Sequence, residues 1–353
     1  MKKSLLKLVF TFVFLCLSAY TYAQMGMGKV EEIEEVMSRK LIVLIEEPRE
    51  KMLKRIEKKP KRGSIEDYKK DLKIYNENVQ AVVEKFWPYN KKDIQYMTFE
   101  EINALKKSKS TEYAVLACLS ARASSFSAGY LYANGLYWVK DIKEDFEDRD
   151  DDMFSVMLVN RIEDWGRVPV FSTTLFDVFP TKASMVYGLK TIDAYFTKRL
   201  NIKKNGIKAK EEKERVLAEM KERAPKVTEK TLLIREEWLD KELTAANFKT
   251  FYPYKYQICD RETMDNVVMN EDANYVYGVE LPIVMSTSRS TFVVYTQYVM
   301  DGKDSQPIVF IKPNYGGMML ASSFTGKAGT RNFTIKTLNK IVEQVQGKGI
   351  EVE

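Results

Sequence analysis

The sequence predicts a mixed α/β fold made of two tandem copies of one unit, in which helices pack on a mixed sheet. An aromatic-proline-tyrosine tetrapeptide occurs twice, as Phe-Trp-Pro-Tyr at residues 86–89 and as Phe-Tyr-Pro-Tyr at residues 251–254. Proline cannot continue a helix and favours extended geometry in the residue before it, so each copy marks a change from helix to strand. The segments 98–113 and 260–275, which each run from a helix-capping residue to a tyrosine, have equal length.

The tetrapeptides are interpreted as plugs that close the end of a core, because large aromatic side chains at a helix-to-strand junction bury most of their surface. The alternative is an aromatic recognition surface. The junction residues are Trp87, Pro88 and Tyr89 in the first copy and Tyr252, Pro253 and Tyr254 in the second.

Each unit is expected to contain the elements β-α-β-α-β-β-β-α. A helix over 30–37, where apolar residues recur at helical spacing, precedes the first unit. Residues 40–47 and 230–237 are apolar runs and are matched at a constant offset as the first strands. The first unit then inserts a lysine-rich segment, 51–73, before a helix over 78–85, and the second unit lacks this insertion.

The remaining elements also recur in pairs. Thr98 and Asp260 are expected to cap the helices that follow the second strands. Turn residues between the last two strands predict a hairpin in each unit, and a closing helix follows, with 189–192 matched to 335–338. The other expected strands are, in pairs, 93–97 and 255–259, 113–116 and 275–279, 154–158 and 292–296, and 169–171 and 307–309.

Residues 1–23 are predicted to form a secretory signal peptide, with a basic start, an apolar run over 8–17 and cleavage after Ala23. Small residues do not precede Cys16 as they would in a lipoprotein signal. Removal of the three signal lysines lowers the formal net charge from +6 to +3, which is typical of a mixed surface and predicts no nucleic-acid partner. The mature chain is expected to be periplasmic or extracellular and to contain no transmembrane segment.

The domain organisation follows from the repeat. The first α/β repeat domain is expected over 24–200 and the second over 227–353. Between them, residues 201–226 carry opposite charges at helical spacing, which predicts a charged helical linker.

The composition excludes several catalytic classes. The chain contains no histidine, so it has no Ser-His-Asp or Cys-His nucleophile and no histidine metal site. It also lacks the glycine patterns of phosphate and dinucleotide loops. We therefore expect no catalytic residue, no cofactor and no metal. The acidic run over 145–152 departs from the spacing of a calcium loop and is interpreted as solvated.

Three other features have a structural and a functional interpretation. Cys118 is expected to be a buried small hydrophobe, and a disulfide between Cys118 and Cys259 is the alternative in an oxidising compartment. The basic cluster within 198–210 is interpreted as a solvated helix face. Small and aromatic residues after Ser120 either cover the sheet or line a groove for a peptide or glycan; the candidate binding residues are Ser124, Ser125, Tyr130, Tyr132, Tyr137 and Trp138.

The duplicated unit and its aromatic-Pro-Tyr junction resemble a group of exported Gram-negative proteins of unknown function. The order of elements is also similar to that of the N-terminal domain of the periplasmic protein TolB and to that of curli-secretion lipoproteins. These resemblances imply protein contact in the cell envelope rather than catalysis. The leading hypothesis is a non-catalytic envelope protein whose paired domains bind a protein partner. The alternatives are a binding protein for a glycan or peptide and a histidine-free hydrolase that uses carboxylates.

Overall fold

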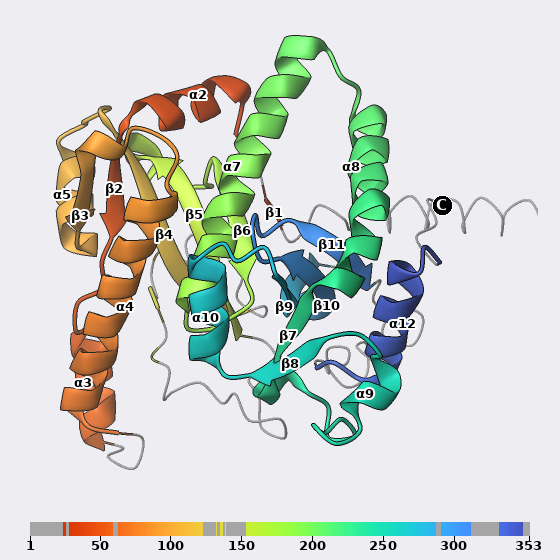
Figure 1. Cartoon of the computed structure of the whole chain (residues 1–353). Coiled ribbons are helices and arrows are strands. Elements are labelled where there is room, and N and C mark those ends of the chain that lie inside the picture. The colour runs from red at the N-terminus through yellow and green to blue at the C-terminus, as the bar shows by residue number, and fades with distance from the viewer. Residues whose placement is uncertain are drawn as a thin grey trace, which may run out of the picture.

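The structure is a computed structural model of the chain, and it has a mixed α/β fold in two similar units (Figure 1). Among the residues that it describes, no helix combines the length and the apolar character needed to cross a bilayer. The described residues are 24–25, 28–58, 63–122, 132, 135–136, 138, 153–286, 291–311 and 332–348.

The first unit contains six strands and its helices lie on both faces of the sheet (Figure 1). The strands are β1 (Gln24–Met25), β2 (Lys40–Leu44), β3 (Ile94–Met97), β4 (Tyr113–Arg122), β5 (Met153–Arg161) and β6 (Phe171–Leu175). The helices are α2 (Val30–Ser38), α3 (Glu50–Lys58), α4 (Ile65–Phe86), α5 (Phe99–Lys107) and α7 (Lys182–Asn205), with 3₁₀ turns η3 (Lys91–Asp93) and η6 (Ile162–Asp164).

The second unit is preceded by α8 and the 3₁₀ turn η7, which span Ala209–Arg223 and Ala224–Glu229. Its strands are β7 (Thr231–Arg235), β8 (Tyr256–Cys259), β9 (Tyr275–Ser286), β10 (Thr291–Asp301) and β11 (Pro307–Ile311). The remaining helices are η8 (Glu236–Trp238), α9 (Phe248–Phe251), α10 (Arg261–Met269) and α12 (Ile335–Val345).

The two sheets have the same strand order. The first is β1-β6-β5-β4-β2-β3 and the second is β11-β10-β9-β7-β8, so they differ only in β1 at one edge. Strands β2 and β7 are each parallel to both of their neighbours, and β4-β5-β6 and β9-β10-β11 each form an antiparallel meander. The predicted element order is confirmed in both units.

Strand register corrects two of the sequence matches. Leu41 lies opposite Ala114 and Leu232 lies opposite Val276, so Leu41 corresponds to Leu232 and the expected match with Thr231 is one residue wrong. By the same comparison Arg161 corresponds to Asp301, two residues from its expected match. A continuous apolar strand has no alternation that fixes its register in the sequence, and only its pairing decides it.

Most described residues of the lysine-rich insertion lie in α3 and α4, and the helix expected over 78–85 is much longer than predicted. Helix α4 begins at Ile65, because the Ser64 hydroxyl accepts a hydrogen bond from the Asp67 backbone N–H at 3.0 Å. Between its many lysines, α4 carries an apolar stripe at helical spacing. The buried residues of this stripe are Tyr68, Leu72, Tyr75, Val79, Val82 and Val83.

Helix caps recur in both units. Thr98 accepts from the Glu101 N–H at 3.3 Å and Asp260 accepts from the Thr263 N–H at 2.8 Å, which confirms both predicted N-caps. The closing helices begin after Thr181 and Thr334, which cap α7 and α12 in the same way. The match of 189–192 with 335–338 is therefore wrong, since the first segment lies well inside α7 and the second begins α12.

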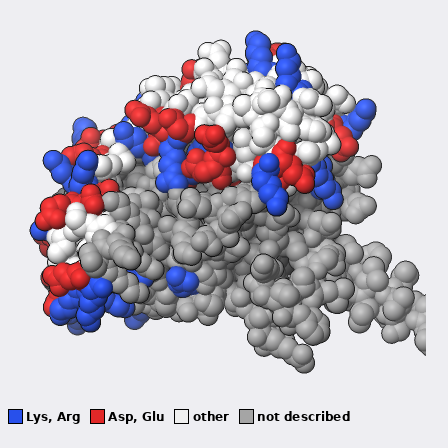
Figure 2. All heavy atoms as spheres, turned by 90° about the horizontal axis from the view of Figure 1, so that it is seen from below, with Lys and Arg blue, Asp and Glu red and all other residues white. Residues whose placement is uncertain are grey.

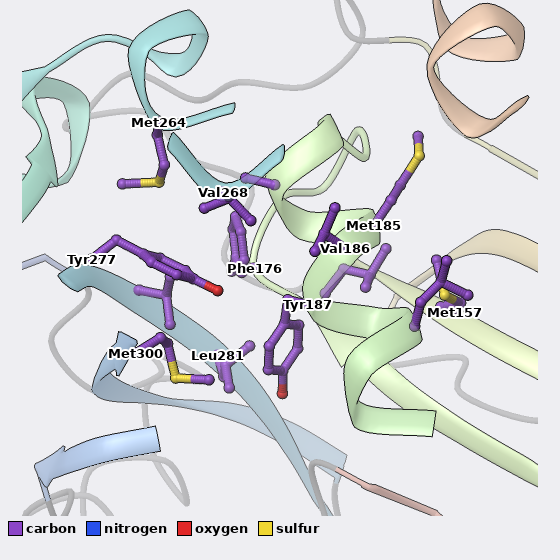
Figure 3. Packing of buried hydrophobic residues seen from close by; sticks show 14 of the residues in the cluster. Met157, Phe176, Met185, Val186, Tyr187, Met264, Val268, Tyr277, Leu281 and Met300 are labelled. Atoms are coloured by element: carbon purple, nitrogen blue, oxygen red, sulfur yellow. The ribbon is translucent and has the colours of Figure 1, made fainter. Parts of the chain in front are cut away.

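Helix α7 joins the two units into one hydrophobic core. It packs on β6 and α4 of its own unit and on α10 of the second unit, and its residues 183–189 are all buried. A helix buried all round needs apolar contacts on every side, and Figure 3 shows Val186 and Tyr187 of α7 beside Phe176 and Val268. Residue 200, the expected end of the first domain, lies within this helix.

Candidate functional site

Two of the six candidate binding residues are placed, and they lie in separate buried clusters. The Tyr132 ring packs edge-on against Trp165 at 4.6 Å, under the face of the first sheet that α5 covers. Trp138 packs against Tyr68 in the α3–α4 hairpin and donates its Nε1–H to Asp71 at 2.7 Å. These two residues do not form a shared exposed surface. The other four, Ser124, Ser125, Tyr130 and Tyr137, lie outside the described residues, as does the acidic run over 145–152.

The junction tetrapeptides have the same geometry in both units. Trp87 and Tyr252 are buried and meet Tyr89 and Tyr254 edge-to-face at 5.3 and 5.5 Å. Each tyrosine is also hydrogen-bonded to the closing helix of its own unit. The Tyr89 hydroxyl donates to Asp193 in the middle of α7 at 2.6 Å, and the Tyr254 hydroxyl accepts from Gln346 at the end of α12 at 3.5 Å.

The prolines of the junctions, Pro88 and Pro253, are exposed, while the aromatic residues before them fill the interior. This arrangement supports the interpretation of the tetrapeptides as plugs.

Both cysteines are free and buried, so the disulfide alternative is not realised. Burial raises the pKa of the Cys118 and Cys259 thiols to about 12, which keeps them protonated and unreactive at neutral pH.

The basic cluster within 198–210 is paired with acidic residues. Lys203 reaches Glu31 of α2 at 2.8 Å, and Lys198 lies 3.7 Å from Glu212 of α8. On the face seen in Figure 2, basic and acidic side chains lie next to one another rather than in separate fields. Among the residues that the structure describes, no cluster of His, Cys, Asp and Glu side chains could hold a metal ion.

Each unit binds its preceding helix through a charge pair at the same position of the sheet, but with opposite signs. Arg161 at the end of β5 pairs with Glu32 and Glu35 of α2 at 2.9 and 3.0 Å. The corresponding Asp301 at the end of β10 pairs with Arg223 of α8 at 3.0 Å and with Lys230 at 2.9 Å.

The pKa of Asp301 shows that its cations dominate its surroundings. Burial alone would raise this pKa, but hydrogen bonds from Lys230 and Arg223 hold it below its ordinary value.

The units cap each other's helices where α7 packs on α10. The Asp265 carboxylate of α10 accepts a hydrogen bond from the Ala183 N–H in the first turn of α7 at 2.7 Å. In the other direction, Lys85 at the end of α4 donates to the Met269 carbonyl, the last of α10, at 2.5 Å. A carboxylate at a helix N-terminus and an ammonium at a C-terminus both complement the helix dipole.

A buried ion pair lies beside these caps. Arg235, the last residue of β7, pairs with Asp177 of the first unit at 2.6 Å, and both side chains are almost fully buried. Thr181 donates to Asp177 at 2.6 Å, and the guanidinium of Arg235 stacks on Trp238 at 3.8 Å. A buried pair needs further polar partners to offset its desolvation. Thr181 supplies one for Asp177, and Glu237 supplies one for Arg235 at 2.9 Å, while the buried Arg235 Nε has no hydrogen-bond partner among the described residues.

This inter-unit cluster had no signal in the sequence, because its members are far apart along the chain. Asp177 follows β6 and Arg235 ends β7. Only the packing of α7 between the sheets brings them together.

The chain covers the β6 edge of the first sheet and the β11 edge of the second sheet in different ways. At the β6 edge, β1 adds a short antiparallel strand. At the β11 edge, the Gln344 side-chain amide accepts from the Phe310 N–H at 3.2 Å and donates to the Phe310 carbonyl at 2.6 Å, and so occupies the place of a neighbouring strand. The chain itself therefore covers part of both edges, at Ser172 and Thr173 of β6 and at Phe310 of β11.

The opposite edges are open in both units. Among the described residues, β3 pairs only with β2, and β8 pairs only with β7. The Ile45 N–H donates to the Met97 carbonyl, so Met97 faces β2 and the backbone groups of Tyr96 point outwards. The Leu232 N–H donates to the Lys255 carbonyl, so the backbone of Ile258 points outwards in the same way.

No protein-family model matches the chain, and searches of curated proteins and of solved structures give no significant match.

Proposed function

We propose that the protein is a non-catalytic, exported binding protein of the cell envelope that holds an extended segment of a partner polypeptide along the open edges of β3 and β8. The observation that carries this proposal is the asymmetry of the sheet edges. The chain covers part of the β6 and β11 edges with β1 and Gln344, whereas among the described residues no strand pairs with the opposite edge of either sheet.

The chemistry of an open edge specifies its ligand. A row of outward N–H and C=O groups at strand spacing is matched by the backbone of another extended chain, which adds to the sheet as a new strand. Side chains on alternate sides of β3 are half-exposed, so they are available to contact such a segment. Lys91, Lys92 and Lys255 lie just before the two edge strands, and lysines at an edge disfavour unspecific pairing.

The absence of histidine supports a non-catalytic role, and the predicted signal peptide supports export.

The test begins with a peptide selected for binding from a displayed library of extended segments. The variant Tyr96→Pro removes one outward N–H, and Tyr96→Ala is its matched control because it removes the same side chain but keeps the N–H. We expect Tyr96→Pro, or Ile258→Pro against Ile258→Ala, to weaken binding about threefold to tenfold beyond its control, the worth of a backbone hydrogen bond.

Two further measurements make the test independent of the variants. Methylation of alternate backbone nitrogens of the peptide should abolish binding, and hydrogen exchange at residues 94 and 96 or at 256 and 258 should slow when the peptide is bound. If proline and alanine variants bind equally well and the methylated peptide still binds, the sheet edges are not the binding site.

A further inference from the structure

The contact between the units places a carboxylate in an unusual environment. Asp265 belongs to α10 of the second unit, yet it caps the first turn of α7 in the first unit. Figure 3 shows its helix neighbours Met264 and Val268 within the shared apolar core, beside Phe176 and Val186. The carboxylate is thus held between an apolar contact and a cluster of other charges.

The charges around Asp265 do not balance when it is ionised. Asp177, in the segment after β6, and Arg235, at the end of β7, both act on the Asp265 carboxyl, and Glu237 of η8 pairs with Arg235 at 2.9 Å. Arg261 lies on α10 itself and pairs with Glu237 at 2.8 Å. Among these described residues, three carboxylates and two guanidiniums lie in one cluster, and the α7 N-terminus adds about half a positive charge.

We propose that Asp265 is a proton-sensitive clamp between the two units: with a proton bound it holds α7 against α10 more firmly than it does when ionised.

The surroundings of the Asp265 carboxyl decide how the stability of the folded protein changes with pH. Burial raises the pKa of Asp265 to about 6; the negative charge of Asp177 adds to this effect, while the Ala183 and Lys182 N–H groups and Arg235 oppose it. In the unfolded chain the same group has its ordinary pKa of 3.8. The folded protein therefore binds the proton more tightly, and this contribution to stability is lost as the pH rises from about 4 through about 6.

The experiment compares the mature wild-type chain with Asp265→Asn, which keeps the acceptor oxygen and removes the charge. Denaturant unfolding is measured between pH 4 and pH 8. We expect the wild-type unfolding constant to rise between pH 4 and pH 7 by about tenfold to a hundredfold more than that of Asp265→Asn. Asp260→Asn is the matched control: Asp260 is exposed on the same helix, and its hydrogen bonds with Thr263 lower its pKa, so it does not titrate in this window.

A second measurement needs no variant. The side-chain carboxyl carbon of Asp265 in the wild-type protein should titrate near pH 6 by NMR, and exchange of the Ala183 amide, corrected for its intrinsic pH dependence, should become faster above that pH. Titration of Asp265 near 4, or the same pH dependence of unfolding in wild type and Asp265→Asn, would overturn the proposal.

Discussion

The two units hold the helix that precedes them with charge pairs of opposite sign. In the first, a basic residue at the end of β5, Arg161, is held by glutamates of α2; in the second, the corresponding Asp301 is held by Arg223 and Lys230. Position and pairing are retained while the signs are exchanged. A helix that precedes a sheet can be fixed by either sign, because only the pair lowers the cost of partly burying each charge.

A second difference lies inside the sheets. Cys118 faces Met157 across β4 and β5, whereas the corresponding pair in β9 and β10 is Glu280 and Gln297. Glu280 accepts from the Asn332 N–H, and Gln297 donates to the Asn332 carbonyl at 3.2 Å. The polar pair fixes the chain where it approaches α12, so the apolar core of the second unit is interrupted for a structural reason.

The closing helices also differ. Helix α7 is buried on all sides through its first turns, and Gly188 lets it approach the sheet so closely that an added Cβ would lie 2.8 Å from the Met157 sulfur. Helix α12 buries one stripe, at Leu338, Ile341 and Val345. The comparison shows that α7 serves both units while α12 covers only one.

The largest predicted effect tests whether the units fold as one body. Trp87→Ala and Tyr252→Ala should each destabilise the protein by about 3–5 kcal/mol, because both remove a large buried ring. Since the units share a core, each variant should unfold in a single transition, monitored by calorimetry and by circular dichroism. Two separate transitions, with only one of them displaced by each variant, would show that the units are independent.

An intermediate effect concerns the charge pairs of inverted sign. Asp301→Asn and Arg161→Gln should each cost about 1–2 kcal/mol, since each leaves partly buried partners without their counter-charge. The pKa of Asp301 is lowered, so its contribution is present at neutral pH and is lost as the pH falls through that lowered pKa. Chemical denaturation should thus show a smaller loss of stability on acidification in Asp301→Asn than in wild type. Equal acid sensitivity of the two proteins would contradict the role assigned to Asp301.

The smallest effect compares the two equivalent helix caps. Thr98→Ala should lower the unfolding free energy by about 1 kcal/mol, and Asp260→Ala should lower it too, because each leaves a backbone N–H of the first turn without its acceptor. Thr98→Ser and Asp260→Asn retain a cap and should be close to neutral at pH 7. A loss of several kcal/mol in either alanine variant would mean that the residue does more than cap its helix.

Much of the fold could be predicted because its signals are local. Prolines after aromatic residues, capping residues and turn residues act within a few positions, so the repeat and its order of elements were visible in one chain. The predicted helix over 78–85 was too short for α4, because the many lysines in the first half of α4 obscured the apolar residues of its buried stripe in the sequence. Trp138 was expected either to cover the sheet or to line a groove, but it packs against Tyr68 of the inserted helices, which were not predicted from the sequence.

The mixed α/β class, the duplication, the caps and the junction residues follow from the sequence, because all of them depend on neighbours along the chain. The strand register, the sharing of α7, the buried Asp177–Arg235 pair and the position of the open edges follow from tertiary packing. These features join residues that are distant in sequence, such as Asp265 with Ala183. Their energies arise from burial and pairing in three dimensions, and no periodicity within one chain segment encodes them.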